Sequence, residues 1–164
     1  MKLSTKIIAQ SGMLSALAIG LSAIEMILPT SALLPAGCKI GFSNLATMMA
    51  AKNVSFFSAF CVTLLKSVFV LITRGFIAFL LSLAGGLFST AVIILIFHDK
   101  KSRFGCIGAG VIGAAAHNTA QICIYSLFVG ISAWYYLPIL LAFGTISGIF
   151  TGTLLFLTQK NIKN

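Results

Sequence analysis

Long apolar runs, separated by short polar breaks, make up most of this chain. Five of them reach the length of about 20 apolar residues that crosses a bilayer, and they cover residues 7–28, 54–73, 76–97, 105–130 and 137–157. A backbone in lipid must satisfy its own hydrogen bonds, and the runs lack the alternation typical of a membrane barrel. Each run is therefore expected to be a helix, which predicts an all-α integral membrane protein.

A sixth segment, at about residues 38–51, is shorter than the others. It becomes long enough to span only if part of SALLPAGCK (31–39) is included, and Pro35 and Gly37 disfavour a regular helix there. We predict a six-helix transmembrane bundle whose second helix is short or broken, forming a single transmembrane domain over residues 1–164. The first run is longer than the apolar core of a signal peptide, so we expect no cleavage after it.

Composition supports a membrane protein. Hydrophobic residues make up 59% of the 164 residues and charged residues 8%, whereas about 25% of the residues in soluble domains are charged. A formal net charge of +9 would suggest nucleic acid as the partner of a soluble protein. Here the basic residues lie at the ends of apolar runs, where membrane topology accounts for them. We therefore expect membrane lipid, and no nucleic acid, as a partner.

The basic residues are distributed unequally between the two sides of the membrane. With the N-terminus in the cytoplasm, the inner segments carry Lys2, Lys6, Lys52, Lys100, Lys101, Arg103, Lys160 and Lys163. The outer ends carry Lys39 and Arg74. This excess predicts that both termini of a multi-pass protein of the cell membrane lie inside.

Polar side chains within the spans gather toward the outer half of the membrane. They are Glu25, Lys39, Asn44, Lys66, Arg74, His117, Asn118 and Gln121. Polar groups in a span are costly, and they usually face the bundle interior or a water-filled cavity. Their convergence predicts a substrate-binding pocket that opens to the outside. Its three cations against one acid favour a small anionic ligand.

Each of these residues also has a structural explanation. Lys39 and Arg74 can extend their charged ends to the outer interface. Glu25 can pair with Lys39 or Lys66 as a structural bridge. The triplet on the fifth span, His117, Asn118 and Gln121, can form hydrogen bonds between helices. The sequence alone leaves both explanations open.

Small residues follow a four-residue spacing on two spans. Gly12, Ala16 and Gly20 form such a stripe on the first span, and Gly144, Gly148 and Gly152 form one on the last. Small residues let another helix approach closely. The first stripe fits either packing within this bundle or docking on a separate membrane partner.

Groups that catalysis or metal binding would need are missing. The two acids, Glu25 and Asp99, are expected on opposite sides of the membrane, so no carboxylate pair can act as acid and base or hold magnesium. There is no GxxxxGK[ST] loop for ATP, and Cys38, Cys61, Cys106 and Cys123 form no CxxC pair. We expect no catalytic residue, metal or cofactor, and a binding or transport component rather than an enzyme.

Three motifs carry a family resemblance: AGCKIGFSN (36–44), LSLAGG (81–86) and GAAAHNTAQ (113–121). They resemble the family known as heptaprenyl diphosphate synthase component I, or Gx transporter family, which is grouped with the S components of energy-coupling factor (ECF) transporters. The resemblance implies a six-helix subunit that binds a vitamin or similar precursor from outside, while a coupling membrane subunit and two ATPases supply energy. It also implies that Gly12, Ala16 and Gly20 contact the coupling subunit.

The family name suggests an alternative function. The chain would be a non-catalytic membrane component that supports heptaprenyl diphosphate or menaquinone-type isoprenoid biosynthesis, with a soluble prenyl synthase as its partner. Prenyl diphosphate synthases use aspartate-rich magnesium motifs, which a chain with one aspartate cannot supply. The name therefore supports an accessory role, and it suggests an isoprenoid- or quinone-related ligand.

Overall fold

The structure, a computed structural model, describes residues 4–98 except 28–40, and residues 104–163. These residues form six α-helices and one 3-10 helix: α1 (Thr5–Ile27), α2 (Asn44–Asn53), α3 (Phe56–Arg74), α4 (Phe76–His98), α5 (Cys106–Val129), η2 (Ile131–Tyr136) and α6 (Leu137–Lys163). No strand occurs among them. The predicted all-α bundle with a short second helix is confirmed.

Five of the helices are long and apolar enough to cross a membrane: α1, α3, α4, α5, and α6 together with η2. Their outward faces carry large apolar side chains, such as Ile72 and Leu127, which are 79% and 78% exposed. Contiguous apolar surface of this kind is unfavourable in water and favourable in hydrocarbon. The protein is therefore a multi-pass membrane protein.

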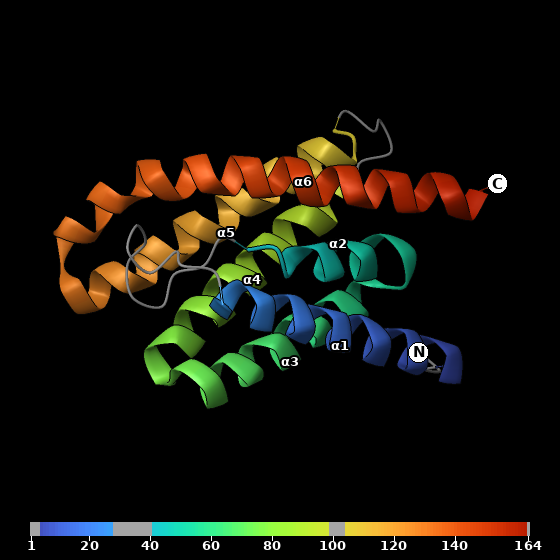
Figure 1. Ribbon diagram of the computed structural model, residues 1–164, viewed down its shortest axis with the longest axis horizontal. Helices are drawn as coiled ribbons and strands as arrows, with labels where there is room; N and C mark the ends of the chain where they lie inside the picture. Colours follow the sequence, from blue (N-terminus) through green and yellow to red (C-terminus); the bar gives the residue numbers. More distant parts are fainter. Residues whose placement is uncertain (1–3, 28–40, 99–103, 164) are drawn as a thin grey trace.

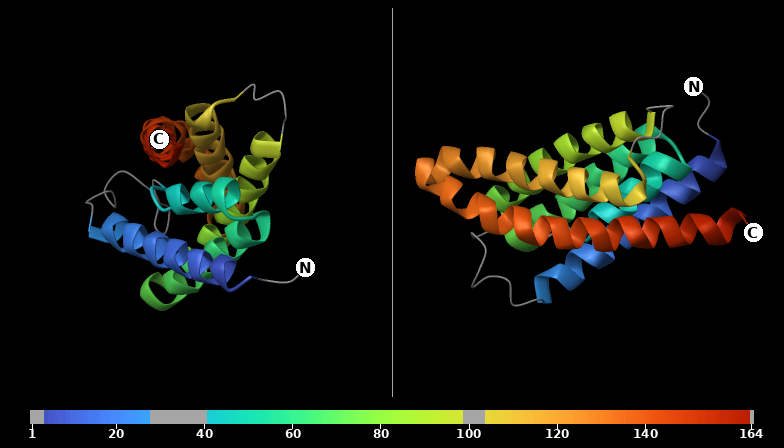
Figure 2. Two further views of the ribbon diagram at one scale, coloured as in Figure 1. Left: turned by 90° about the vertical axis from the view of Figure 1, so that its right-hand side faces the viewer. Right: turned by 90° about the horizontal axis from the view of Figure 1, so that it is seen from above.

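Successive helices alternate in direction along the bundle (Figure 1), and α1 is inclined to α6 (Figure 2). The start of α1 and the end of α6 lie at the same end of the bundle, together with the ends of α2 and α4 (Figures 1 and 2). We call this the termini end. The opposite end, which we call the η2 end, holds η2 and the connection between α3 and α4.

Helix α2 lies at the centre of the bundle and extends along about half of the bundle's length. It contacts each of the other five α-helices, and Figure 2 shows it enclosed among them when the bundle is seen along its axis. Its 10 residues span about 15 Å, roughly half of the hydrocarbon core. It runs from near the middle of the bundle to the termini end (Figure 1).

Local sequence explains where several helices begin and end. The Ser55 hydroxyl accepts a hydrogen bond from the Ser58 N–H at 3.1 Å and caps the start of α3. Gly75 and Gly130 follow the ends of α3 and α5 with φ of 85° and 87°. Glycine adopts such positive φ values without the steric cost of a side chain, so both helices can stop there.

The closest helix contact joins α5 to α6 through the stripe of Gly144, Gly148 and Gly152. A Cβ added to Gly148 would lie 2.6 Å from the Cα of Val111, and one added to Gly152 would lie 2.5 Å from the Cα of Ile107. Backbone therefore touches backbone at this interface. The stripe on the last span serves packing inside the bundle.

Candidate functional site

Buried polar side chains surround the point where α2 begins. Asn44 is the first residue of α2, while Glu25 comes from α1 and Lys66 from the middle of α3. All three are buried, and Lys66 is only 1% exposed. The short length of α2 thus creates a helix start deep inside the bundle, where polar groups from neighbouring helices meet it.

Glu25 holds the turn that leads into α2. Its Oε1 accepts hydrogen bonds from the backbone N–H of Gly41, at 2.7 Å, and of Phe42. Gly41 has φ of 97°, a conformation that favours glycine. The structure therefore gives Glu25 a partner that the sequence did not suggest, the backbone of the turn itself.

Lys66 and Asn44 form the second part of this cluster. The Lys66 Nζ donates a hydrogen bond to the Asn44 Oδ1 at 2.9 Å, and its ammonium also interacts electrostatically with the Glu25 carboxylate. The described charges at the start of α2 are thus one cation and one anion. Any surplus of positive charge must come from Lys39 or Arg74.

Those two predicted residues are placed differently. Lys39 lies outside the described residues. Arg74 is the last residue of α3 and is half-buried at the η2 end, about 12 Å further along the helix than Lys66. Arg74 therefore lies away from the start of α2. At the end of α3, its side chain can reach the membrane–water interface.

The structure divides the polar triplet of α5, whose three members are buried. The Asn118 Nδ2 donates a hydrogen bond to the Leu140 carbonyl oxygen of α6 at 2.6 Å, so Asn118 links two helices. His117 and Gln121 face α4 instead. A Cβ added to Gly85 would lie 3.0 Å from the Gln121 Cγ and 3.0 Å from the His117 Cε1. Gly85 therefore makes room for these two side chains.

Gln121 is fully buried with its amide unsatisfied. Neither its Nε2 nor its Oε1 has a hydrogen-bond partner within the part of the chain that the structure describes, and the same is true of the Asn44 Nδ2 and the Asn118 Oδ1. Burying an unpaired amide costs about 1–3 kcal/mol. Such groups are rare in native proteins unless a ligand or water binds them.

The stripe of Gly12, Ala16 and Gly20 lies on the outer surface of the bundle. All three residues are exposed, and no atom of another described segment lies within 4 Å of a Cβ added to Gly12 or Gly20. The opposite face of α1 packs inward through Leu14, Ser15 and Ala18. Of the two explanations for this stripe, packing within the bundle is therefore wrong.

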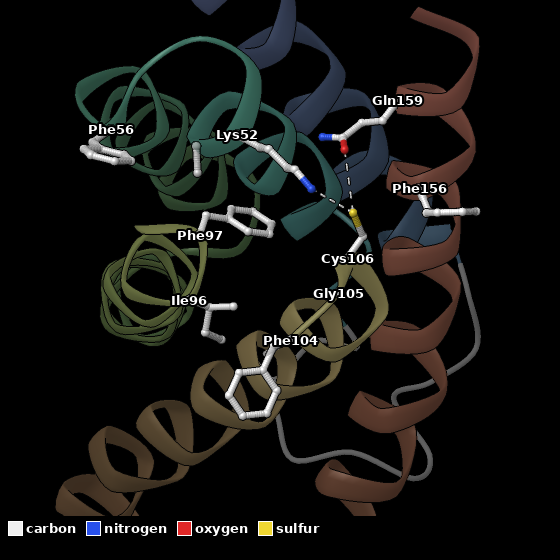
Figure 3. Close-up of a pocket in the computed structure, with 10 residues that line it drawn as sticks. Lys52, Phe56, Ile96, Phe97, Phe104, Gly105, Cys106, Phe156 and Gln159 are labelled. Carbon is white, nitrogen blue, oxygen red and sulfur yellow. Dashed lines mark hydrogen bonds between the residues drawn. The ribbon is translucent and has the colours of Figure 1, made fainter. Parts of the chain in front are cut away.

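A pocket at the termini end could not be predicted from the sequence. Lys52, Cys106 and Gln159 contribute its polar groups (Figure 3). In the sequence, Lys52 contributes only to the excess of basic residues on the inner side, and Cys106 is one of four cysteines that form no CxxC pair. Only their spatial proximity, which no spacing in the sequence reveals, identifies them as neighbours.

Comparison with known proteins identifies the family. The sequence profile described as heptaprenyl diphosphate synthase component I matches residues 14–157. The chain belongs to this family. Among solved structures, the S component of a bacterial ECF transporter is similar in fold, with a TM-score of 0.63 and 21% sequence identity over 97% of this chain and 96% of that chain. A comparison with curated protein sequences finds no match.

The three motifs that carried the resemblance lead into α2 or lie on α4 and α5, three helices that contact one another. The first motif ends in Gly41, Phe42 and Asn44, the turn that Glu25 holds. The second ends in Gly85 and Gly86 of α4, and the third supplies His117 and Gln121, which pack on Gly85. The second and third motifs are thus in direct contact, while the first forms the start of α2.

Proposed function

We propose that this protein is the substrate-binding membrane subunit of an ECF-type importer, which captures a small anionic precursor from the outside. The observation that carries the proposal is the fully buried amide of Gln121, which packs on Gly85 of α4 and has no hydrogen-bond partner among the described residues. A buried amide in this position is costly, and a bound ligand would repay its desolvation. The similar fold of an S component supports the same function.

The geometry suggests how the ligand would be held. The N-terminal end of a helix carries a partial positive charge, and broken helices present such ends to anionic substrates in many transporters. Helix α2 presents this end in the middle of the bundle. Lys39 and Arg74 would supply the net positive charge on the outer side, because Lys66 is balanced by Glu25. Asn44, His117, Asn118 and Gln121 would then orient the ligand.

The exposed stripe of Gly12, Ala16 and Gly20 would dock on the coupling membrane subunit. Its open surface lets a partner helix approach the α1 backbone closely. ATP hydrolysis by two partner ATPases would then drive release of the ligand inside the cell. Isoprenoid- or quinone-related precursors are the first ligands to examine, because the family description names prenyl diphosphate synthesis.

Native mass spectrometry of the full-length protein, purified gently from its own membrane, tests this function. We expect a bound small anion that is lost in Gln121→Leu. Thr119→Val is the matched control, because the Thr119 hydroxyl bonds to the Ala115 carbonyl oxygen of its own helix at 2.8 Å. Leu removes the unpaired amide, so Gln121→Leu should unfold at the same or a higher temperature than the native protein. A ligand that Gln121→Leu retains would refute the proposed site.

A second function, a non-catalytic subunit that supports isoprenoid biosynthesis, is favoured by the family description alone. It predicts that the purified protein carries a soluble prenyl synthase, without a coupling subunit or ATPases. Affinity purification from the host membrane separates the two functions. A coupling subunit that is lost in Gly12→Leu favours import, whereas a synthase that remains bound in this variant favours the accessory role.

A further inference from the structure

The pocket at the termini end is lined by Ala51 and Lys52, near the end of α2 opposite to Asn44. Figure 3 shows its lining. Its volume is about 510 Å³, within the range of about 300–1,000 Å³ that holds small ligands. Five helices contribute to its lining, since α2, α3, α4, α5 and α6 all end or begin near it. The pocket is thus formed by the fold itself.

Lys52 turns its charged end into this pocket. Its Nζ lies 3.0 Å from the Cys106 Sγ and 4.9 Å from the centroid of the Phe97 ring, and Figure 3 shows the side chain directed toward Cys106. A lysine at the membrane–water interface that has no binding role is expected to extend its ammonium toward water. Lys52 is exposed as a residue, but its ammonium lies beside a thiol and an aromatic face of the pocket.

Neither neighbour supplies a negative charge. A thiol is a weak hydrogen-bond acceptor, and an aromatic face attracts a cation only modestly. Glu25 is the one acid within the described ranges, and its carboxylate binds the turn at the other end of α2. Asp99, the second acid of the sequence, lies outside these ranges. The described part of the pocket therefore offers a cation without an anionic partner.

The remaining walls of the pocket are apolar. Phe97 and Phe104 lie on one side and Phe156 on another. Phe104 and Phe156 are also about half exposed on the outer surface, so the apolar wall continues onto the part of the protein that faces lipid. A ligand that fits such a pocket has an anionic head for Lys52 and a hydrocarbon chain for the aromatic wall.

We propose that this pocket binds a phosphate-headed anionic lipid from the membrane leaflet at the termini end. The phosphate would lie beside the Lys52 ammonium, and one hydrocarbon chain would lie along Phe97 and Phe104. Lysines near a membrane surface attract anionic lipids, and Lys52 lies near the end of α2 that faces the termini end of the bundle. The site is separate from the proposed import site, and it would exist whether or not that function holds.

Native mass spectrometry of the full-length protein in detergent, titrated with phosphatidylglycerol or with phosphatidylcholine of the same chains, tests the site. We expect phosphatidylglycerol to bind more tightly, and Lys52→Gln to weaken its binding about fivefold while phosphatidylcholine binding is unchanged. Lys160→Gln is the matched control, because Lys160 is exposed like Lys52 but does not line the pocket. It should leave the selectivity for phosphatidylglycerol intact.

A second pair of variants tests the apolar wall. Phe104→Ala should weaken phosphatidylglycerol binding, whereas Phe128→Ala, an equally exposed phenylalanine near the η2 end, should not. Inorganic phosphate distinguishes a lipid site from a plain anion site, and it should not displace the lipid at equal concentration. Equal losses in Lys52→Gln and Lys160→Gln, equal binding of both lipids, or displacement by inorganic phosphate would each overturn the proposal.

Discussion

At the scale of single residues, the two buried charges show how an apolar bundle keeps ionised groups. The Glu25 carboxylate binds two backbone N–H groups, and the Lys66 ammonium binds the Asn44 amide oxygen. A buried charge is tolerated only when it is paired and hydrogen-bonded. Each group therefore depends on the turn that starts α2, and each helps to hold that turn in place.

Removing one charge should cost more than removing both. Lys66→Met leaves the buried Glu25 carboxylate without its neighbouring cation, and breaking such a pair costs about 3–5 kcal/mol. The double variant Glu25→Gln/Lys66→Met should be more stable than the sum of the two single variants predicts. Unfolding in SDS, followed by circular dichroism, measures the free energies. Strictly additive losses would mean that the two groups do not interact.

Most of the cluster could be predicted from the sequence, but its division of roles could not. Hydropathy identifies Glu25, Lys66, His117 and Gln121 as polar residues in apolar runs, and the cost of burial implies that they face inward. Whether an amide bonds to a neighbouring helix, as in Asn118, or keeps its hydrogen-bonding groups free, as in Gln121, depends on distances of a few ångströms between helices. Such distances have no signature in a single helix sequence.

At the scale of helices, two stripes with the same spacing have opposite environments. Gly148 and Gly152 press against the α5 backbone, while Gly12 and Gly20 face open space. The four-residue spacing only places small residues on one side of a helix. The neighbour that this side meets is decided by how the helices are arranged around α2.

The two stripes should therefore respond differently to the same substitution. Gly148→Leu places a large side chain against the Val111 backbone, and we expect it to abolish the folded monomer, because overpacking alone costs about 1–3 kcal/mol and backbone cannot move aside as a side chain can. Gly12→Leu should leave the elution volume and helix content unchanged. Size-exclusion chromatography in detergent and circular dichroism provide the comparison. Unfolding of Gly12→Leu would show that α1 packs differently from this structure.

At the scale of the whole molecule, both described chain ends lie at the same end of the bundle (Figure 1). That arrangement requires an even number of passes along the bundle, and α2 runs opposite in direction to α1 and α3. Lys6, Lys52 and Lys160 lie at the termini end, and Arg74 lies at the other. Because cytoplasmic ends carry excess lysine and arginine, we expect the termini end to face the cytoplasm.

Accessibility to a membrane-impermeant maleimide in intact cells tests this orientation. In a variant whose native cysteines are replaced by alanine, Ser132→Cys in η2 should react from outside, because Ser132 is exposed at the η2 end. Lys160→Cys should react only after the cells are opened. The reverse pattern would place the η2 end in the cytoplasm and would contradict capture of a ligand from outside.

The class of protein, the number of helices and the short second helix could all be predicted from the sequence. These properties follow from the length and polarity of each segment, which are local, because lipid imposes the same requirement on every span. Its motifs also identified the family. The tertiary structure decided which side each small stripe faces, which polar groups Glu25 and Asn118 bind, and that Lys52 and Cys106 share a pocket. These features join residues far apart in the chain, so they exist only once the helices are packed together.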